Sequence, residues 1–152
     1  MMMLMQYMKI LETVKIVLLE FDIANIAGLL APIENEDNNT TCFFINCNGA
    51  EAQFVHTTAD YVKVANILDP LCIPDEIVYH IFPLNAVRNY EGISNLLLAA
   101  QVTELVDGIF INCSINHAVV DGTSFWHFFN TWSEISRAGS NNISQPPPFF
   151  GR

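Results

Sequence analysis

The segment NHAVVDG, residues 116–122, carries the residue types and spacing best suited to catalysis in this chain. It places His117 four residues before Asp121, and Gly122 follows directly. An imidazole has an ordinary pKa of about 6.5, so a histidine can accept a proton from a reacting group at neutral pH. Composition alone would give an H-x-x-x-D pair in roughly 20% of such chains, and the added glycine lowers this to roughly 1%. The pattern with glycine therefore indicates a candidate general base, whereas the bare pair would not.

The change in hydrophobic period around this segment predicts where the histidine lies. Residues 109–116 alternate between apolar and polar types, as in a half-buried strand that ends near Asn116. A helix should follow, capped by Thr123 or Ser124 and ending near Gly139. The histidine should lie in the loop between the two, where its ring can reach a cleft. The helix has a core-facing aromatic stripe, made of Phe125, Phe128, Phe129, Trp132 and Ile135.

The other histidines are better explained as ordinary surface or packing residues. His56 lies in an expected strand, His80 in an irregular region, and His127 beside the aromatic stripe. No carboxylate or cysteine stands near them at metal-ligand spacing, so the sequence predicts no metal site.

Length and composition limit the function further. The 152 residues suffice for one domain, but 51% are hydrophobic and only 14% are charged. So little charge predicts that part of the surface is buried against something or that part of the protein is missing. The net charge of −10 argues against nucleic acid and against an anionic membrane surface as partners.

The location expected from the sequence is the cytoplasm. The apolar start, residues 1–20, is interrupted by charges and resembles neither a membrane span nor a secretion signal. The cysteines form no C-x-x-C pair and are predicted to be reduced thiols: Cys42, Cys47, Cys72 and Cys113.

Several other elements follow from local patterns. Residues 9–20 and 59–69 are predicted helices, and 34–41 is a polar, acidic loop. Two hairpins are predicted, one over 42–57 with its turn at Asn48-Gly49 and one over 95–116 with its turn at Asp107-Gly108. Residues 70–95 are expected to be irregular because of their prolines and glycine.

The stretch INHAVVDGTSFWHFFNTWSEI resembles the H-x-x-x-D-G region of the plant BAHD acyltransferases. FPLNAVRNYEG, LLLAAQVTELVDGIFINCSINH and SQPPPFF are similar to the same family in the same order. Related condensation domains carry two adjacent histidines in this motif, and Asn116 before His117 therefore favours the BAHD side. The resemblance covers roughly residues 26–152.

The resemblance implies both a fold and a reaction. The fold would be α/β, with a mixed, largely antiparallel sheet and flanking helices, as one incomplete lobe of a chloramphenicol-acetyltransferase-like fold. The reaction would be acyl transfer from an acyl-CoA co-substrate to a small-molecule alcohol or amine, without a bound cofactor. His117 would be the general base. Asp121 would be structural, with its usual arginine partner farther along the chain. Its place beside a tight turn separately predicts that Asp121 is partly buried and held by backbone N–H groups of residues 122–124. Gly122 would allow a sharp turn and leave room for the substrate.

The chain also departs from the family pattern. IANIAGLL at 23–30 lacks the aromatic pair, proline and arginine of the family's F-Y-P-L-A-G-R-L motif, and no D-F-G-W-G occurs. We expect an apolar helical segment at 1–25, a partial N-terminal acyltransferase domain at 26–139, a Pro-rich linker at 140–152 and a missing C-terminal domain. The resemblance assigns no residue of this chain to coenzyme binding, and the residues that determine substrate specificity are expected largely in the missing domain. The alternative is a truncated, non-catalytic product or an interaction module.

Overall fold

The computed structural model describes residues 27–47, 52–69 and 71–138. The helix predicted over 9–20, the turn at Asn48-Gly49 and the linker at 140–152 lie outside the described residues. The described elements follow in the order β1 (Leu29–Asn35), β2 (Thr40–Asn46), β3 (Gln53–Ala59), α2 (Val64–Leu68), α3 (Asp75–Ile81), the 3-10 helix η2 (Asn89–Ile93), β4 (Leu98–Leu105), β5 (Ile109–Ile115) and α4 (Gly122–Ala138).

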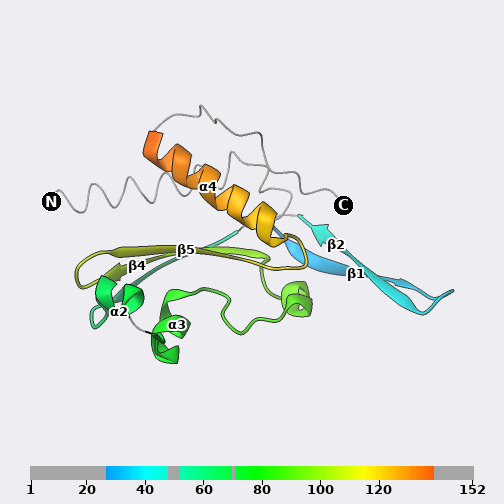
Figure 1. The fold of residues 1–152 in the computed structure, drawn as a ribbon. Coiled ribbons are helices and arrows are strands. Elements are labelled where there is room, and N and C mark those ends of the chain that lie inside the picture. Colours follow the sequence, from blue (N-terminus) through cyan, green and yellow to red (C-terminus); the bar gives the residue numbers. More distant parts are fainter. Residues whose placement is uncertain (1–26, 48–51, 70, 139–152) are drawn as a thin grey trace.

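The strands form two small sheets with helices on both sides of the larger one. β1 and β2 pair antiparallel as a two-stranded ribbon that projects from the body (Figure 1). In the second sheet, β4 lies between a parallel β3 and an antiparallel β5. α4 covers one face of this sheet, and α2 and α3 lie on the other (Figure 1). The predicted fold class, a mixed and largely antiparallel sheet with flanking helices, is confirmed.

The predicted hairpin over 42–57 is wrong. β2 pairs with β1 across the acidic turn at 36–39, whereas β3 joins the other sheet beside β4. Local patterns do not predict the strand over 29–35, because Pro32 in its middle lacks a backbone N–H donor. A two-stranded ribbon consists of two edge strands, and an edge strand tolerates a proline on its unpaired side. The hairpin of β4 and β5, with its turn at Asp107-Gly108, is confirmed.

The region 70–95 is more regular than its prolines suggest. It contains α3, which begins directly after Pro74, and the 3-10 helix η2. Proline is well suited to a helix start, because the first amides of a helix need no partner within the helix. The prediction of an irregular region was therefore wrong for these two segments. The helix predicted over 59–69 is confirmed in part as α2.

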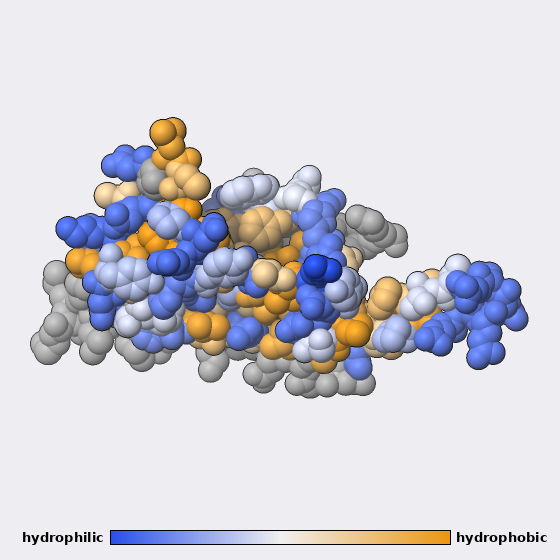
Figure 2. Space-filling model, turned by 90° about the horizontal axis from the view of Figure 1, so that it is seen from below, coloured by the Kyte–Doolittle hydropathy of each residue, from blue (hydrophilic) through white to orange (hydrophobic). Residues whose placement is uncertain are grey.

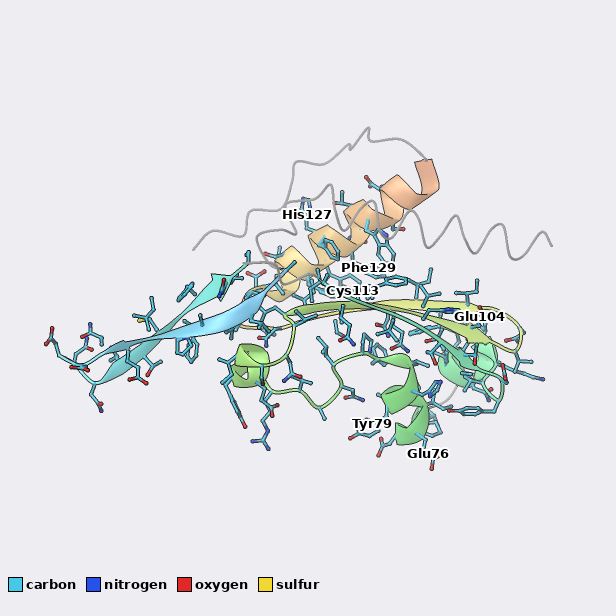
Figure 3. The ribbon with its side chains drawn as sticks, turned by 180° about the vertical axis from the view of Figure 1, so that it is seen from behind. Glu76, Tyr79, Glu104, Cys113, His127 and Phe129 are labelled. Carbon is cyan, nitrogen blue, oxygen red and sulfur yellow. The ribbon has the colours of Figure 1, made fainter. Side chains whose placement is uncertain are left out.

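The core lies on both faces of β4, which is buried over almost its whole length. On one face, Leu98 and Ala100 pack against Phe128 and Trp132 of α4. Figure 3 shows Cys113 and Phe129 in the same layer between α4 and the sheet. The opposite face packs on a second cluster, formed by Ala59, Val62 and Leu105. Phe128, Phe129 and Trp132 of the predicted aromatic stripe therefore lie in the core. Phe125 is half-buried and is not part of this cluster, and the side chain of Ile135 lies outside the described part.

Two buried amides explain why polar residues occur on this second face. Gln101 and Asn112 lie opposite each other on β4 and β5. Gln101 Nε2 donates to the carbonyl of His80 at 2.7 Å, and Asn112 Nδ2 donates to that of Ile81. The final carbonyls of a helix have no partner within it, so these amides satisfy the end of α3. The position of α3 on the sheet is thus fixed by polar contacts as well as by packing.

Replacing Gln101 with methionine should lower the free energy of unfolding by about 1–3 kcal/mol. The change keeps the side-chain volume but leaves the His80 carbonyl without its amide donor, and losing one partner of a buried hydrogen bond costs about this much. Gln53 on β3 is exposed and offers a matched control, so Gln53→Met should change stability by less than ~0.5 kcal/mol. Urea unfolding followed by circular dichroism measures both. Equal midpoints for the two variants would show that the amide does not hold α3.

The surface is mixed in character. Figure 2 shows apolar side chains interspersed with polar ones on the face that carries α2 and α3, and a polar tip on the β1–β2 ribbon. Among the described helices, none is long and apolar enough to cross a membrane. All four cysteines are free thiols, as the sequence predicts.

Candidate functional site

The turn between β5 and α4 carries the candidate base. β5 ends at Ile115, residues 117–119 form a turn, and α4 begins at Gly122, so the predicted position of His117 is confirmed. His117 is exposed. Within the described ranges its ring has no hydrogen bond, ion pair or ring contact.

Asn116, the residue before His117, organises this turn, a role for its side chain that the sequence does not predict. Asn116 Oδ1 accepts from the amide of Ala118 at 2.9 Å, and its backbone carbonyl accepts from Val119 at 3.1 Å. Asn116 Nδ2 donates to the carbonyl of Asn89 in η2 at 2.9 Å. An asparagine at a strand end is a known former of such local turns, and this was the available signal. The contact between Asn116 and Asn89 joins residues that are distant in the sequence, and no local pattern indicates it.

Asp121 is the residue that caps α4. Its Oδ1 accepts from the amide of Ser124 at 2.8 Å, and its backbone carbonyl accepts from Phe125 at 3.0 Å. The expected bond to an amide of residues 122–124 is confirmed, whereas the choice of Thr123 or Ser124 as the cap is wrong. The expected burial is also wrong, because Asp121 is exposed. The helix dipole stabilises a carboxylate at a helix N-terminus, so Asp121 can cap α4 while its side chain stays in contact with solvent.

Replacing Asp121 with alanine should therefore destabilise the chain by about 1 kcal/mol, the typical value of an N-cap. Asp121→Asn keeps an oxygen that can accept from Ser124, so it should retain most of the capping contribution. The difference between the alanine and asparagine variants, measured by thermal unfolding, isolates the cap. An alanine variant as stable as the asparagine variant would contradict this assignment.

Gly122 does not have the backbone role predicted for it. It is the first residue of α4, its φ lies outside the left-handed region, and a Cβ there would meet no atom within 4 Å. The turn therefore does not require glycine for its conformation. The space next to Gly122 is open among the described residues.

The remaining histidines have other partners and lie apart from this turn. His56 Nε2 lies 3.0 Å from Glu104 Oε1 on the neighbouring strand, and His80 Nε2 lies 2.9 Å from the carbonyl of Thr58. His127 lies 3.3 Å from the hydroxyl of Thr131, on the side of α4 that points away from the sheet (Figure 3). In the ranges that the structure describes, no group of three or more potential ligands could hold a metal ion.

Cys113 lies near the site but is a poor nucleophile. It points from β5 into the layer beneath α4, and burial raises the pKa of its thiol to about 12. The thiolate is the reactive form of cysteine, so this side chain stays protonated and inert at neutral pH.

The fold and the site together define a class of protein: a mixed sheet with a histidine on the turn between a half-buried strand and an aromatic helix. Solved structures share the fold of this chain. F. graminearum TRI101 complexed with coenzyme A and T-2 mycotoxin aligns with a TM-score of 0.57 at 18% identity, over 88% of this chain and 32% of that chain. A condensation domain of the enacyloxin polyketide synthase aligns with a TM-score of 0.52 at 15% identity, over 95% of this chain and 24% of that one. These similarities show one part of a chloramphenicol-acetyltransferase-like fold.

Sequence similarity then identifies the family. Residues 25–152 match the Transferase family, and the chain therefore belongs to it, together with the plant BAHD acyltransferases. An uncharacterised acetyltransferase of Arabidopsis thaliana is 42% identical over 120 residues, covering 79% of this chain and 27% of the relative. BAHD acyltransferase DCR, also of Arabidopsis thaliana, is 42% identical over 100 residues, covering 66% and 20%. Shikimate O-hydroxycinnamoyltransferase of Nicotiana tabacum is 34% identical over 110 residues, covering 71% and 23%. The chain spans about a quarter of the length of these relatives.

Proposed function

We propose that this chain supplies the general base of an acyl-CoA-dependent acyltransferase, and that the base is His117. The observation that carries the proposal is an exposed imidazole, free of other contacts in the described ranges, on the turn between β5 and α4 of a Transferase-family chain. The acceptor would be the hydroxyl or amine of a small molecule, and the donor an acyl-CoA thioester.

The chemistry follows from the acidity of the acceptor. A hydroxyl is too weakly acidic to ionise in neutral water, so its proton must leave while its oxygen attacks the thioester carbonyl. The imidazole of His117 takes that proton, the new C–O bond forms and the C–S bond breaks. The imidazolium then returns the proton to the departing sulfur, which leaves as the free thiol of coenzyme A. Proton transfer of this kind contributes about 10²–10⁴ to a rate.

The coenzyme site is proposed to lie largely outside this chain. The phosphates of coenzyme A need basic or backbone N–H donors. The whole chain has only 6 basic residues against 16 acidic ones. Lys63 and Arg88 are the basic residues whose side chains fall in the described part, and they lie on different segments, before α2 and before η2. The remainder of a family-length protein would therefore bind the phosphates and complete the substrate channel.

The second candidate is a non-catalytic module, and a specific observation favours it for the chain alone. Large apolar side chains are exposed on the β1–β2 ribbon, with Ile33 at 54%, Phe43 at 51% and Phe44 at 46%. Such a surface fits a protein that binds another domain. The two candidates differ in what the chain does once that domain is present.

A chimera tests the proposal. Residues 26–138 would replace the matching segment of the tobacco shikimate O-hydroxycinnamoyltransferase, whose name gives the acyl group and the acceptor. We expect the chimera to release coenzyme A thiol and form the ester, and the 152-residue chain alone to give no turnover above its His117→Ala variant. A folded chimera that binds acyl-CoA yet releases no thiol would contradict the proposed function and favour the module.

A further inference from the structure

We propose that Asn116 is the positioning residue for His117, holding the turn that carries the base against the 3-10 helix η2. The inference rests on the proposed function. It is carried by the hydrogen bonds of one side chain, which joins two segments that are 27 positions apart in the sequence.

Asn116 uses all of its polar groups. Its backbone amide donates to the carbonyl of Leu97 at 2.7 Å, just before β4. Its backbone carbonyl and its Oδ1 accept from Val119 and Ala118, and its Nδ2 donates to the carbonyl of Asn89. Two hydrogen bonds therefore close the turn that contains His117, and two more tie the start of that turn to Leu97 and to Asn89.

The partner segment is itself closely fitted to Asn116. Gly92 of η2 is buried, and a Cβ there would lie 3.0 Å from Asn116 Nδ2 and 2.7 Å from Leu97 Cδ2. The helix η2 can thus approach the turn only because residue 92 has no side chain. Its first turn is secured by Glu91, whose Oε2 accepts from the amide of Arg88 at 2.6 Å. The Asn89 carbonyl therefore belongs to a helical turn whose start is itself hydrogen-bonded.

This arrangement matters because nothing in the described part of the chain holds the His117 ring directly. The direction of the ring then depends on the backbone of the turn. A displacement of about 1 Å at a reacting group can lower a rate by about 10²-fold. Asparagine suits the role because its amide offers a donor toward Asn89 and an acceptor toward Ala118. Aspartate offers only the acceptor.

Two variants separate the two halves of the amide. Asn116→Ala removes both side-chain bonds. Asn116→Asp keeps the acceptor for Ala118 but places a carboxylate oxygen against the Asn89 carbonyl. In the 152-residue chain, hydrogen exchange at the Ala118 amide should be about tenfold faster in the alanine variant and close to the original rate in the aspartate variant. Gln101→Met is the matched control, because it also removes a hydrogen bond from a side-chain amide to a backbone carbonyl. That carbonyl belongs to His80 in α3, on the face of the sheet opposite α4 (Figure 1).

The activity readout uses the chimera described above. We expect kcat to fall by about 10-fold to 100-fold in both Asn116 variants with KM changed by less than about threefold, while Gln101→Met keeps its kcat. In the His117→Ala background, Asn116→Ala should cause no further loss of kcat, because its effect acts through the histidine. An unchanged kcat in Asn116→Ala, or an equal loss in Gln101→Met, overturns the inference.

The two proposals fail in different ways. If His117 is not the base, His117→Ala keeps full turnover, whereas the exchange rate of Ala118 still reports whether Asn116 holds the turn. If Asn116 has no positioning role, His117→Ala still loses activity, and Ala118 exchanges at the same rate with and without the Asn116 amide. If Asn116→Ala fails to fold, Asn116→Asp tests the inference alone. Its kcat should then be lower than that of Gln101→Met, and an equal kcat would overturn the positioning role.

Discussion

His117→Ala in the chimera with the tobacco enzyme is expected to lower the rate of acyl transfer by about 10²–10⁴-fold, which is the usual contribution of a general base. Folding should change little, because His117 is exposed and makes no contact within the described ranges that alanine would remove. Exposed substitutions of this kind usually alter stability by less than ~0.5 kcal/mol. Steady-state release of coenzyme A thiol measures the rate, and circular dichroism measures the fold.

His127→Ala is the control for this prediction. It removes the same ring from the same part of the chain, but His127 points away from the sheet on α4 and lies near Thr131 (Figure 3). Its turnover should stay within about twofold of the original. If His117→Ala turned over as fast as His127→Ala, some other group would take the proton and the proposed role of His117 would be lost.

The position of His117 could be predicted because it depends on local patterns. The alternation that ends at Ile115 and the helical spacing that begins after Gly122 are each set by neighbouring residues. The hairpin of β4 and β5 was predictable for the same reason, since the Asp107-Gly108 turn directs its strands back on each other. Both features depend on residues within a short window of the sequence, which is why local patterns predict them.

Choices between distant partners could not be made in this way. β2 lies between β1 and β3 in the sequence, and either could have been its strand partner. In the structure β2 pairs with β1, and β3 pairs with β4, which lies more than 40 positions away in the sequence. The amides of Gln101 and Asn112 fix α3 from strands that follow it in the sequence. No local period reveals such contacts, and the prolines of 70–95 concealed the helices themselves.

The candidate site also combines features that local sequence predicts with features that depend on distant contacts. Three residues in a row of four could cap α4, since aspartate, threonine and serine are all favourable, and only the fold selects Asp121. The link from Asn116 to Asn89 required η2 to lie beside the end of β5. The sequence thus predicted which residue could act as a base, while the contacts that hold its turn became visible only in three dimensions.

Phe128→Ala is expected to have the largest effect on stability, about 3–5 kcal/mol. The side chain is 2% exposed and packs with Leu98, Ala100 and Trp132, so its removal leaves a cavity between α4 and the sheet. Native domains are stable by only about 5–15 kcal/mol, and this loss should make much of the chain unfold near physiological temperature.

Trp126→Ala provides the comparison, because it removes an equally large ring from the same helix at a position that is 60% exposed. Trp126 makes edge contacts with Phe125 and Phe129, so it should cost at most about 1.5 kcal/mol. Urea unfolding followed at 222 nm gives both values.

Because α4 begins just after the turn of His117, the Phe128 variant should also speed hydrogen exchange at Ala118, whereas Trp126→Ala should not. Equal unfolding midpoints for the two variants would mean that α4 is not packed on β4 and β5 in solution, and the turn would then lose the support on which the proposed chemistry depends.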